Sequence, residues 1–184
     1  YWPALHGSVG AIITSFLVIP IITFMSKKIG KKKAFIISQL ISIIGYILFW
    51  FLFIPGKPYM FLFALPFHSF GIGSLFTIMM SMTADICDLD ELENGKRREG
   101  VLGAVYWWMV KLGFGVAGLL SGLTLQFVGF DADNVTEFAI DGMRIFYTLI
   151  PIVGILIAIY IMKDYDITEE RANEIKEKLK LKNN

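Results

Sequence analysis

The chain has 184 residues, of which 55% are hydrophobic and 18% are charged, and its formal net charge is +1. An average soluble domain has about 25% charged residues, so this composition points away from an ordinary soluble protein. The single cysteine, Cys87, excludes an internal disulfide bond and any metal site built from several cysteines.

Five long stretches of the sequence contain almost no charge: 9–25, 34–54, 59–84, 101–125 and 145–162. The one formal charge within them is Lys111. A helix needs about 20 apolar residues to cross a hydrocarbon core about 30 Å thick, and a soluble domain of this size could not bury so many uncharged residues. The sequence therefore predicts an all-α integral membrane protein with five transmembrane helices.

Lysines and arginines alternate between the segments that join these stretches. They concentrate after the first, third and fifth stretches, whereas the opposite side has only Lys57 and Arg144. Because positively charged loops stay in the cytoplasm, we expect a multi-pass protein of the plasma or bacterial inner membrane with its N-terminus outside. Residues 1–163 are predicted to form a partial transmembrane bundle, and residues 164–184 a cytoplasmic tail with a short helix that Thr168 can cap. An odd number of spans that starts outside suggests the later part of a longer chain.

Lys111 is the most informative single residue. It lies about 15 Å along a helix that enters the membrane near Val101, which places it close to the bilayer midplane. An ionisable residue at this depth is costly and marks a substrate or ion pathway by default; a snorkelling side chain and a purely structural partner are the alternatives. Because no acid lies in the five stretches, we expect a carboxylate or bound ion from outside this chain to face Lys111.

Aromatic and small residues surround this lysine in the sequence. Trp107 and Trp108 precede Lys111 by four and three residues, so both flank its side of the helix; they can line a pathway or face lipid. Gly118-x-x-x-Gly122 predicts a small-residue face for close helix packing.

The segment from Asp85 to Gly100 collects six acidic and three basic residues. It does not fit the template of a calcium-binding loop. A solvated polar loop is one interpretation. The other is a cytoplasmic gate, in which Asp85 and Asp88 pair with basic residues of another domain in only one conformational state.

No catalytic motif is recognisable in the sequence. His68 lies inside the third stretch and is interpreted as a hydrogen-bonded packing histidine rather than a ligand. No zinc signature, nucleophile elbow or Walker phosphate loop is found. We therefore expect neither an enzyme, nor a metal site, nor a cofactor.

Three motifs carry a family resemblance: Ala84-Asp85-Ile86-Cys87-Asp88-Leu89-Asp90-Glu91, then Gly95-x-Arg97-x-Glu99-Gly100, then Val110-Lys111-x-Gly113. Together they resemble the glycoside–pentoside–hexuronide:cation symporter family of the major facilitator superfamily, whose best-known member is the sodium-coupled melibiose permease. The resemblance covers nearly the whole chain and implies spans eight to twelve of a twelve-span transporter, within its C-terminal bundle.

The resemblance also implies roles for individual residues. It associates Lys111 with the substrate cavity and cation coupling, and Asp85 and Asp88 with the inner gate. We expect Trp107 and Trp108 to lie near Lys111, and Arg97 and Glu99 to belong to the same gate. The main sugar- and cation-binding acids of the family lie in its N-terminal spans, outside this chain. The sequence Tyr106-Trp107-Trp108 is more aromatic than in melibiose permease, which leaves the substrate open.

The expected function is the C-terminal part of a symporter that couples Na⁺ or H⁺ to a sugar, glycoside or sugar acid by alternating access. Its expected partners are a small-molecule solute, the bilayer and the N-terminal bundle of the same protein, and not nucleic acid. Two alternatives are a symporter of an amphiphile such as a lysophospholipid, and a membrane scaffold or receptor that does not transport.

Overall fold

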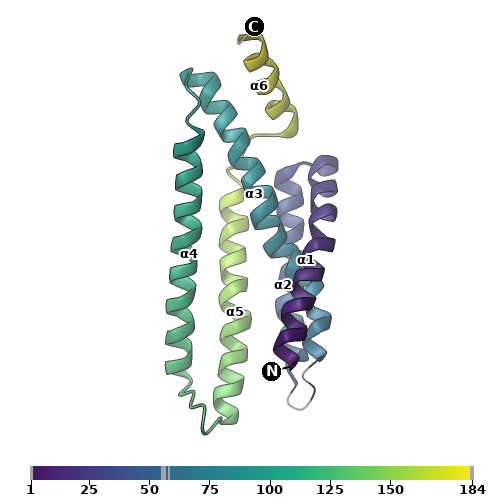
Figure 1. Cartoon of the computed structure of the whole chain (residues 1–184), viewed down its shortest axis with the longest axis vertical. Helices are drawn as coiled ribbons and strands as arrows, with labels where there is room; N and C mark the ends of the chain where they lie inside the picture. Colours follow the sequence, from purple (N-terminus) through teal and green to yellow (C-terminus); the bar gives the residue numbers. More distant parts are fainter. Residues whose placement is uncertain (1, 55–56, 58, 183–184) are drawn as a thin grey trace.

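The computed structural model describes residues 2–54, 57 and 59–182. Its elements are the helices α1 (Trp2–Ile29), α2 (Lys31–Leu52), η1 (Met60–Ala64, a 3-10 helix), α3 (Leu65–Asn94), α4 (Glu99–Phe127), α5 (Glu137–Met162) and α6 (Glu169–Lys182). Within these described residues, five helical segments are long and apolar enough to cross a membrane. Figure 1 shows α1 to α5 running lengthwise, with α6 beyond the ends of α1, α2 and α5 and beside the last turns of α3. The predicted all-α membrane fold with five transmembrane helices is confirmed.

The helices extend beyond the uncharged stretches, because a helix does not have to end where the hydrocarbon ends. α5 begins at Glu137, after Thr136, whose hydroxyl accepts a hydrogen bond from the Ala139 N–H at 3.2 Å. α3 continues through the acidic residues to Asn94, so the expectation of a polar loop beginning at Asp85 is wrong. Only the short link between α3 and α4 remains as a loop.

Two glycines with positive φ allow the chain to change direction sharply where helices end. Gly30, at φ 85°, is the only residue between α1 and α2. Gly95, at φ 68°, ends α3 in the left-handed conformation, and its N–H donates to the Glu91 carbonyl at 2.9 Å. A side chain would be strained at either backbone conformation, so glycine permits both reversals.

α2 and α3 pack closely along a line of small and polar residues. A Cβ placed on Gly45 would lie 2.6 Å from the His68 backbone nitrogen. Further along, the Gln39 side chain donates to the Gly71 carbonyl at 3.2 Å and to the Ser74 hydroxyl at 3.0 Å. Buried amides need such partners in an apolar interior, so this contact sets the register of the two helices.

Apolar layers complete the core around α2 and α3. A cluster of Ile22, Phe35, Ile78 and Met82 joins α1, α2 and α3. Nearer the other end, the His68 ring packs edge-on against Tyr46 and Phe49, with centroids 5.1 and 5.6 Å apart. His68 therefore packs in an aromatic layer, and its predicted hydrogen bond stays a prediction.

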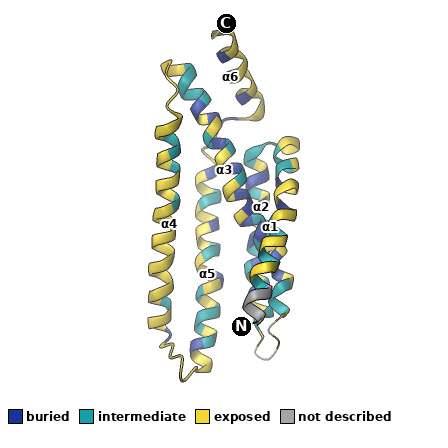
Figure 2. Cartoon of the chain, in the orientation of Figure 1, coloured by how far each residue is buried: buried dark blue, intermediate teal, exposed yellow. Residues whose placement is uncertain are grey.

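α4 differs from the other membrane helices. It touches α3 and α5, but within the described chain none of its residues is buried. Figure 2 shows intermediate and exposed residues along its whole length, whereas buried residues gather on α2 and α3. α4 therefore carries more uncovered surface than a helix inside a finished bundle.

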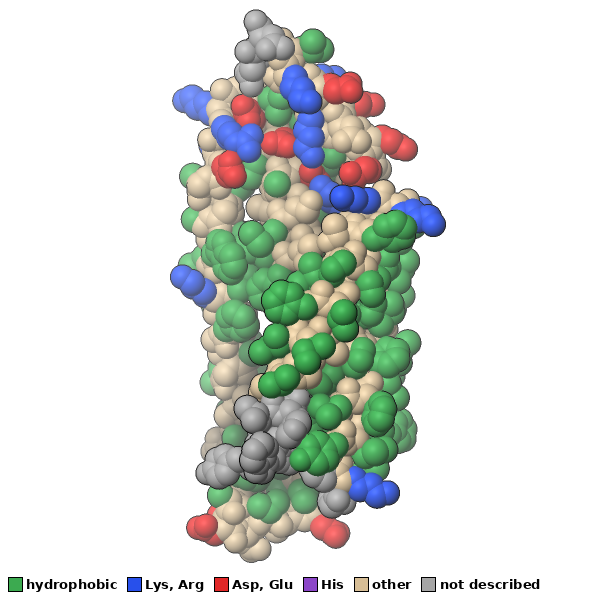
Figure 3. Space-filling view, turned by 45° about the vertical axis from the view of Figure 1, so that its right-hand side comes forward, with side chains coloured by type: hydrophobic (Ala, Val, Ile, Leu, Met, Phe, Trp, Pro, Cys, Tyr) green, Lys and Arg blue, Asp and Glu red, His purple; other side chains and the backbone are tan. Residues whose placement is uncertain are grey.

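The charged side chains lie mostly outside this apolar part of the molecule. Figure 3 shows lysine, arginine, aspartate and glutamate side chains crowded at one end of the molecule, above a broad hydrophobic surface. We call this end, formed by the start of α2, the last turns of α3, the α3–α4 link and α6, the charged end.

The contact at Gly45 gives a test of the helix packing. Gly45→Ala places a methyl group against backbone that cannot rotate away, and overpacking of this kind costs about 1–3 kcal/mol. We expect the midpoint of thermal unfolding in detergent to fall by several degrees. The control, Gly154→Ala in α5, has no atom of the described residues within 4 Å of the new methyl group and should be neutral or slightly stabilising. Equal midpoints for both variants would contradict the packing.

Candidate functional site

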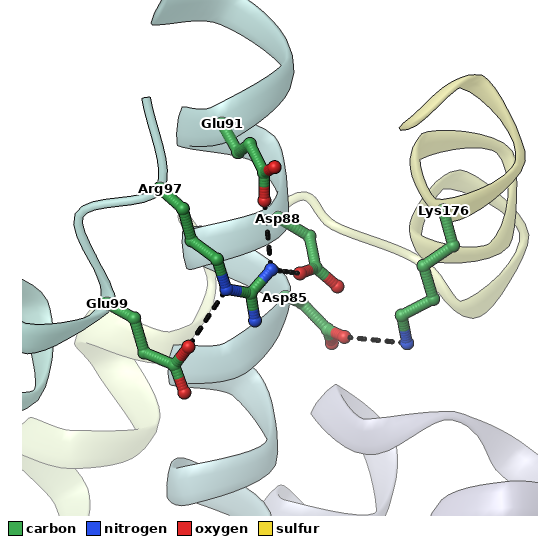
Figure 4. A network of polar contacts seen from close by, with 6 residues as sticks. All are labelled: Asp85, Asp88, Glu91, Arg97, Glu99 and Lys176. Atoms are coloured by element: carbon green, nitrogen blue, oxygen red, sulfur yellow. Dashed lines mark hydrogen bonds and ion pairs between the residues drawn. The ribbon is translucent and has the colours of Figure 1, made fainter. Parts of the chain in front are cut away.

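Arg97 organises the outermost part of the charged end. From the α3–α4 link its guanidinium donates to Glu91 at 2.9 Å, to Glu99 at 2.9 Å and to Asp88 at 3.2 Å, and Figure 4 shows the three carboxylates around it. Hydrogen bonds to these carboxylates, that to Glu91 most of all, raise the pKa of Arg97. The arginine thus ties the last turns of α3 to the first turn of α4.

The structure brings together three of the four predicted gate residues, Asp88, Arg97 and Glu99, and adds Glu91. Glu91 follows Asp88 by three residues on the same helix, so helical spacing could have identified it. The neighbouring Arg98 donates to Asp90 through Nε at 2.8 Å. The arginines are 49% and 53% exposed, and exposed pairs of this kind are individually weak. The cluster can therefore exchange partners at little cost.

Asp85 lies below this cluster in a different environment. It is 3% exposed and pairs with Lys31 at the start of α2, itself 14% exposed. Lys176 of α6 reaches the other carboxylate oxygen at 3.5 Å (Figure 4). Asp85 therefore joins three elements that are far apart in the chain.

The link between α5 and α6 is fixed next to this ion pair. The Lys32 ammonium donates to the carbonyls of Lys163 at 2.6 Å and Tyr165 at 2.8 Å. α6 then buries Ala172, Ile175 and Leu179 and packs against α3. Its first turn is capped as the sequence predicts, because the Thr168 hydroxyl accepts from the Arg171 N–H at 3.3 Å.

The sequence predicts a gate role for Asp85 but does not indicate that Lys31 and Lys176 are its partners. Nothing local in the sequence distinguishes these two lysines from the other lysines of the same segments, all of which are also topology signals. The pairing of Asp85 and Asp88 with basic residues of another domain stays a prediction. What the structure adds is that both carboxylates already have partners within this chain.

Lys111 lies in the middle of α4, away from the charged end. It is exposed, and no hydrogen bond or ion pair joins it to any residue that the structure describes. Trp107 and Trp108 are 45% and 62% exposed. The predicted coupling residues therefore lie on one helix, and Lys111 has no hydrogen-bond or ion-pair partner among the described residues.

The small residues of α4 are equally uncovered. Lys111, Gly115, Gly118 and Gly122 follow one another at spacings of four, three and four, which places them on one face of the helix. A Cβ at any of these glycines would meet no atom of the described chain within 4 Å. The predicted packing face at Gly118 and Gly122 thus stays a prediction. In the described ranges, no group of three or more His, Cys, Asp or Glu side chains is arranged as a metal site.

The buried ion pair predicts how the tail helix is held. Asp85→Asn removes the carboxylate that faces Lys31 and Lys176, and breaking a buried pair costs up to about 3–5 kcal/mol. We expect α6 to detach more often, so trypsin should cleave at its lysines faster than in the wild type. The matched control, Asp90→Asn, loses a pair with the exposed Arg98 and should change the rate little. Wild-type cleavage of the Asp85 variant would show that the pair does not hold α6.

Tyr165, in the α5–α6 link, predicts a pH effect. Burial, and then the charge of Asp85, raise the pKa of its hydroxyl. The folded protein therefore holds this proton more tightly than the unfolded chain, in which the pKa is about 10. Its contribution to stability is complete below about pH 10 and is lost as the pH rises further.

No described residue forms a hydrogen bond with the buried Tyr165 oxygen. Tyr165→Phe should therefore change stability at pH 7 by no more than about 1 kcal/mol. It should also reduce the loss of stability as the pH rises above about 10, followed as the thermal midpoint. The same alkaline loss in both proteins would refute the assignment.

Comparison with known proteins agrees with the helices and motifs described above. A family model described as "MFS/sugar transport protein" matches residues 4–169. The glucuronide carrier protein homolog of Escherichia coli (strain K12) is 31% identical over 157 residues, covering 85% of this chain and 34% of that protein. The isoprimeverose transporter of Lactiplantibacillus pentosus is 26% identical, over 79% of this chain and 30% of that protein.

A third relative, a putative glycoside/cation symporter of E. coli K12, is 21% identical over 95% of this chain and 37% of its own length. The chain thus spans about a third of the length of these relatives. The names of the three describe carriers, transporters and symporters, not enzymes. No solved structure matches the chain.

The family model covers most of the chain, and the relatives agree with it. The chain therefore belongs to the MFS/sugar transport family of the major facilitator superfamily and is similar to its glycoside–pentoside–hexuronide:cation symporters, as the motifs predict.

Proposed function

We propose that this chain is the C-terminal part of a cation-coupled symporter, which carries a sugar, glycoside or sugar acid together with Na⁺ or H⁺ by alternating access. The relatives support the substrate class, since they are named for a glucuronide, for isoprimeverose and for glycosides. Their length supports the partial status, because this chain spans about a third of each. In the proposed orientation the charged end is cytoplasmic, in accord with its excess of lysine and arginine.

The exposed position of Lys111 is the single observation that carries this proposal. An ammonium group near the bilayer midplane is costly unless it faces a polar partner, and the described helices supply none. In the whole transporter, the face of α4 with Lys111 would look toward the N-terminal bundle and the solute between the two. There it would meet a carboxylate, a bound solute or the site of the coupling cation.

The charged end supports an inner gate. Alternating access needs contacts that form in one state and separate in the other. The Arg97 cluster is suited to this, because its exposed pairs cost little to break. Asp85 is suited to the opposite task, since its buried pair keeps α2, α3 and α6 together as one body.

One observation favours an amphiphile as the alternative solute. Between the outer parts of α2, α4 and α5 lies a groove of about 1130 Å³, which we call the outer groove. Phe53, Phe61, Phe146 and Tyr147 line it, with Lys57 and Arg144 as its cations. An apolar groove beside two cations suits a lipid-like anion. Carboxylates facing Lys111 from the N-terminal bundle would favour a sugar.

Lys111→Ala in the full-length transporter tests the proposal. We expect uptake of a labelled sugar, glycoside or sugar acid, driven by a Na⁺ or H⁺ gradient, to fall at least tenfold at equal membrane expression. Lys180→Gln, an exposed change on α6, is the control and should leave uptake as in the wild type.

Three outcomes separate the alternatives. Unchanged gradient-driven uptake by Lys111→Ala would refute the role of Lys111. Uptake of a lysophospholipid but of no sugar would favour the amphiphile. A wild type that takes up no solute at all would favour a scaffold or receptor.

A further inference from the structure

The corner where α1 turns into α2 is the most basic segment of the chain. Five of the seven residues 27–33 are lysines. No aspartate or glutamate precedes Asp85 in the sequence, so neither α1 nor α2 contains an acid that could neutralise them. Lys163, at the end of α5, lies beside the start of α2, because its carbonyl accepts from Lys32. Four lysines of this region are exposed, and we call them the lysine border: Lys27, Lys28, Lys33 and Lys163.

The other two lysines of the corner already have partners. Lys31 pairs with the buried Asp85, and the Lys32 ammonium donates to two backbone carbonyls of the α5–α6 link. The lysine border, by contrast, forms no ion pair and no side-chain hydrogen bond with any residue that the structure describes. Even Asp164, which directly follows Lys163, is not paired with it. Four neighbouring positive charges thus lack a counter-charge within the described part of the chain.

Aromatic rings lie beside two of these ammonium groups. The Lys28 Nζ lies 5.9 Å from the centroid of the Phe24 ring, and the Lys163 Nζ lies 3.7 Å from that of Tyr160. Both rings are exposed, at 65% and 66%, on helices long and apolar enough to cross the membrane. Tyrosine is enriched where hydrocarbon meets the headgroups, and a lysine stem follows apolar surface until its ammonium group reaches the polar region. The rings therefore place the lysine border at the level of the lipid headgroups.

The distribution of charge on the surface agrees with this level. On the right-hand side of Figure 3, basic side chains border the hydrophobic surface directly, and acidic side chains lie above them. A lipid headgroup at this height would therefore meet the basic side chains before the acidic ones.

We propose that the lysine border binds the phosphate groups of anionic phospholipids in the leaflet at the charged end, which is the cytoplasmic leaflet in the proposed orientation. A cluster of about four to eight basic residues next to a transmembrane helix is typical of proteins that bind anionic lipid. Each such lysine strengthens attraction to an anionic surface about fivefold. Several lysines together therefore give a clear preference over a neutral headgroup.

A signal for membrane orientation alone is the alternative interpretation of these lysines. Such a signal requires positive charge in the segment but no bound lipid. Five lysines within seven residues also repel one another, and an anionic headgroup relieves this repulsion. The same corner holds Asp85 through Lys31 and the α5–α6 link through Lys32. Bound lipid would therefore also steady the attachment of α6.

Native mass spectrometry of the full-length transporter tests the occupant, with the protein released from nanodiscs that hold equal amounts of phosphatidylglycerol and phosphatidylcholine. We expect the wild type to retain at least about fivefold more phosphatidylglycerol than phosphatidylcholine. The triple variant Lys27→Gln/Lys28→Gln/Lys33→Gln should lose most of this preference. The matched control, Lys178→Gln/Lys180→Gln/Lys182→Gln, removes the same charge from exposed positions on α6, beyond the ends of α1, α2 and α5 (Figure 1), and should behave as the wild type.

Three results of this experiment would overturn the proposal. The first is equal retention of the two lipids by the wild type, as expected of an orientation signal alone. The second is the same lipid preference in both triple variants. The third is displacement of phosphatidylglycerol by inorganic phosphate, as expected of a site for a soluble anion.

A labelling experiment on the unmodified protein does not depend on whether the variants fold. Phosphatidylglycerol with a photoreactive group on its headgroup is added to the full-length transporter in nanodiscs, and the labelled peptides are identified by mass spectrometry. We expect label within residues 24–33 or 160–163. Label confined to other residues would overturn the proposal.

Uptake separates this inference from the proposed function. The inference uses the proposed membrane orientation but neither the solute nor the coupling cation. Normal gradient-driven uptake by a transporter without headgroup preference refutes the lipid site alone. A headgroup preference in a protein that transports no solute refutes only the proposed function.

Discussion

The cost of placing a charge in an apolar interior is the constraint on which this structure depends. It separates the lysines, arginines and acids from five apolar helices and gathers most of them at one end (Figure 3). Where a charge is buried, as at Asp85, the chain supplies opposite charge from two other elements. Where a charge has no partner among the described residues, as at Lys111, we propose that a group from outside this chain faces it.

The two kinds of ion pair at the charged end differ in how much free energy it costs to separate them. Asp85 is buried, so separating it from Lys31 would leave an uncompensated charge in a poorly hydrated site. The Arg97 cluster is half exposed, so water can replace each of its contacts. A gate that opens repeatedly needs contacts of the second kind, and a body that moves as a unit needs the first. Helix α3 contributes to both kinds of ion pair, through Asp85 and Asp88, which are about one turn apart.

The sequence was sufficient for the number of helices, their approximate positions and the cap at Thr168, because hydrocarbon thickness and helix capping are local constraints. The prediction of a loop after Asp85 was wrong. A row of acidic residues is typical of a solvated loop, and the sequence does not show that Arg97 and Arg98 pair with these acids. The partners of Asp85 could not be predicted, because Lys31 and Lys176 lie 54 and 91 residues away. Such contacts depend on tertiary packing, not on any local pattern.

The same constraint applies to α4, which carries the charge at Lys111. Within the described residues, a helix with no buried residue, uncovered small side chains and a lysine without a polar partner departs from what is expected of a finished membrane helix. The small side chains lack packing neighbours, which only protein or lipid can supply. Lys111 lacks a charged or polar partner, which a solute or cation can supply and withdraw. That difference is the reason why we propose Lys111, and not the small residues of α4, for transport.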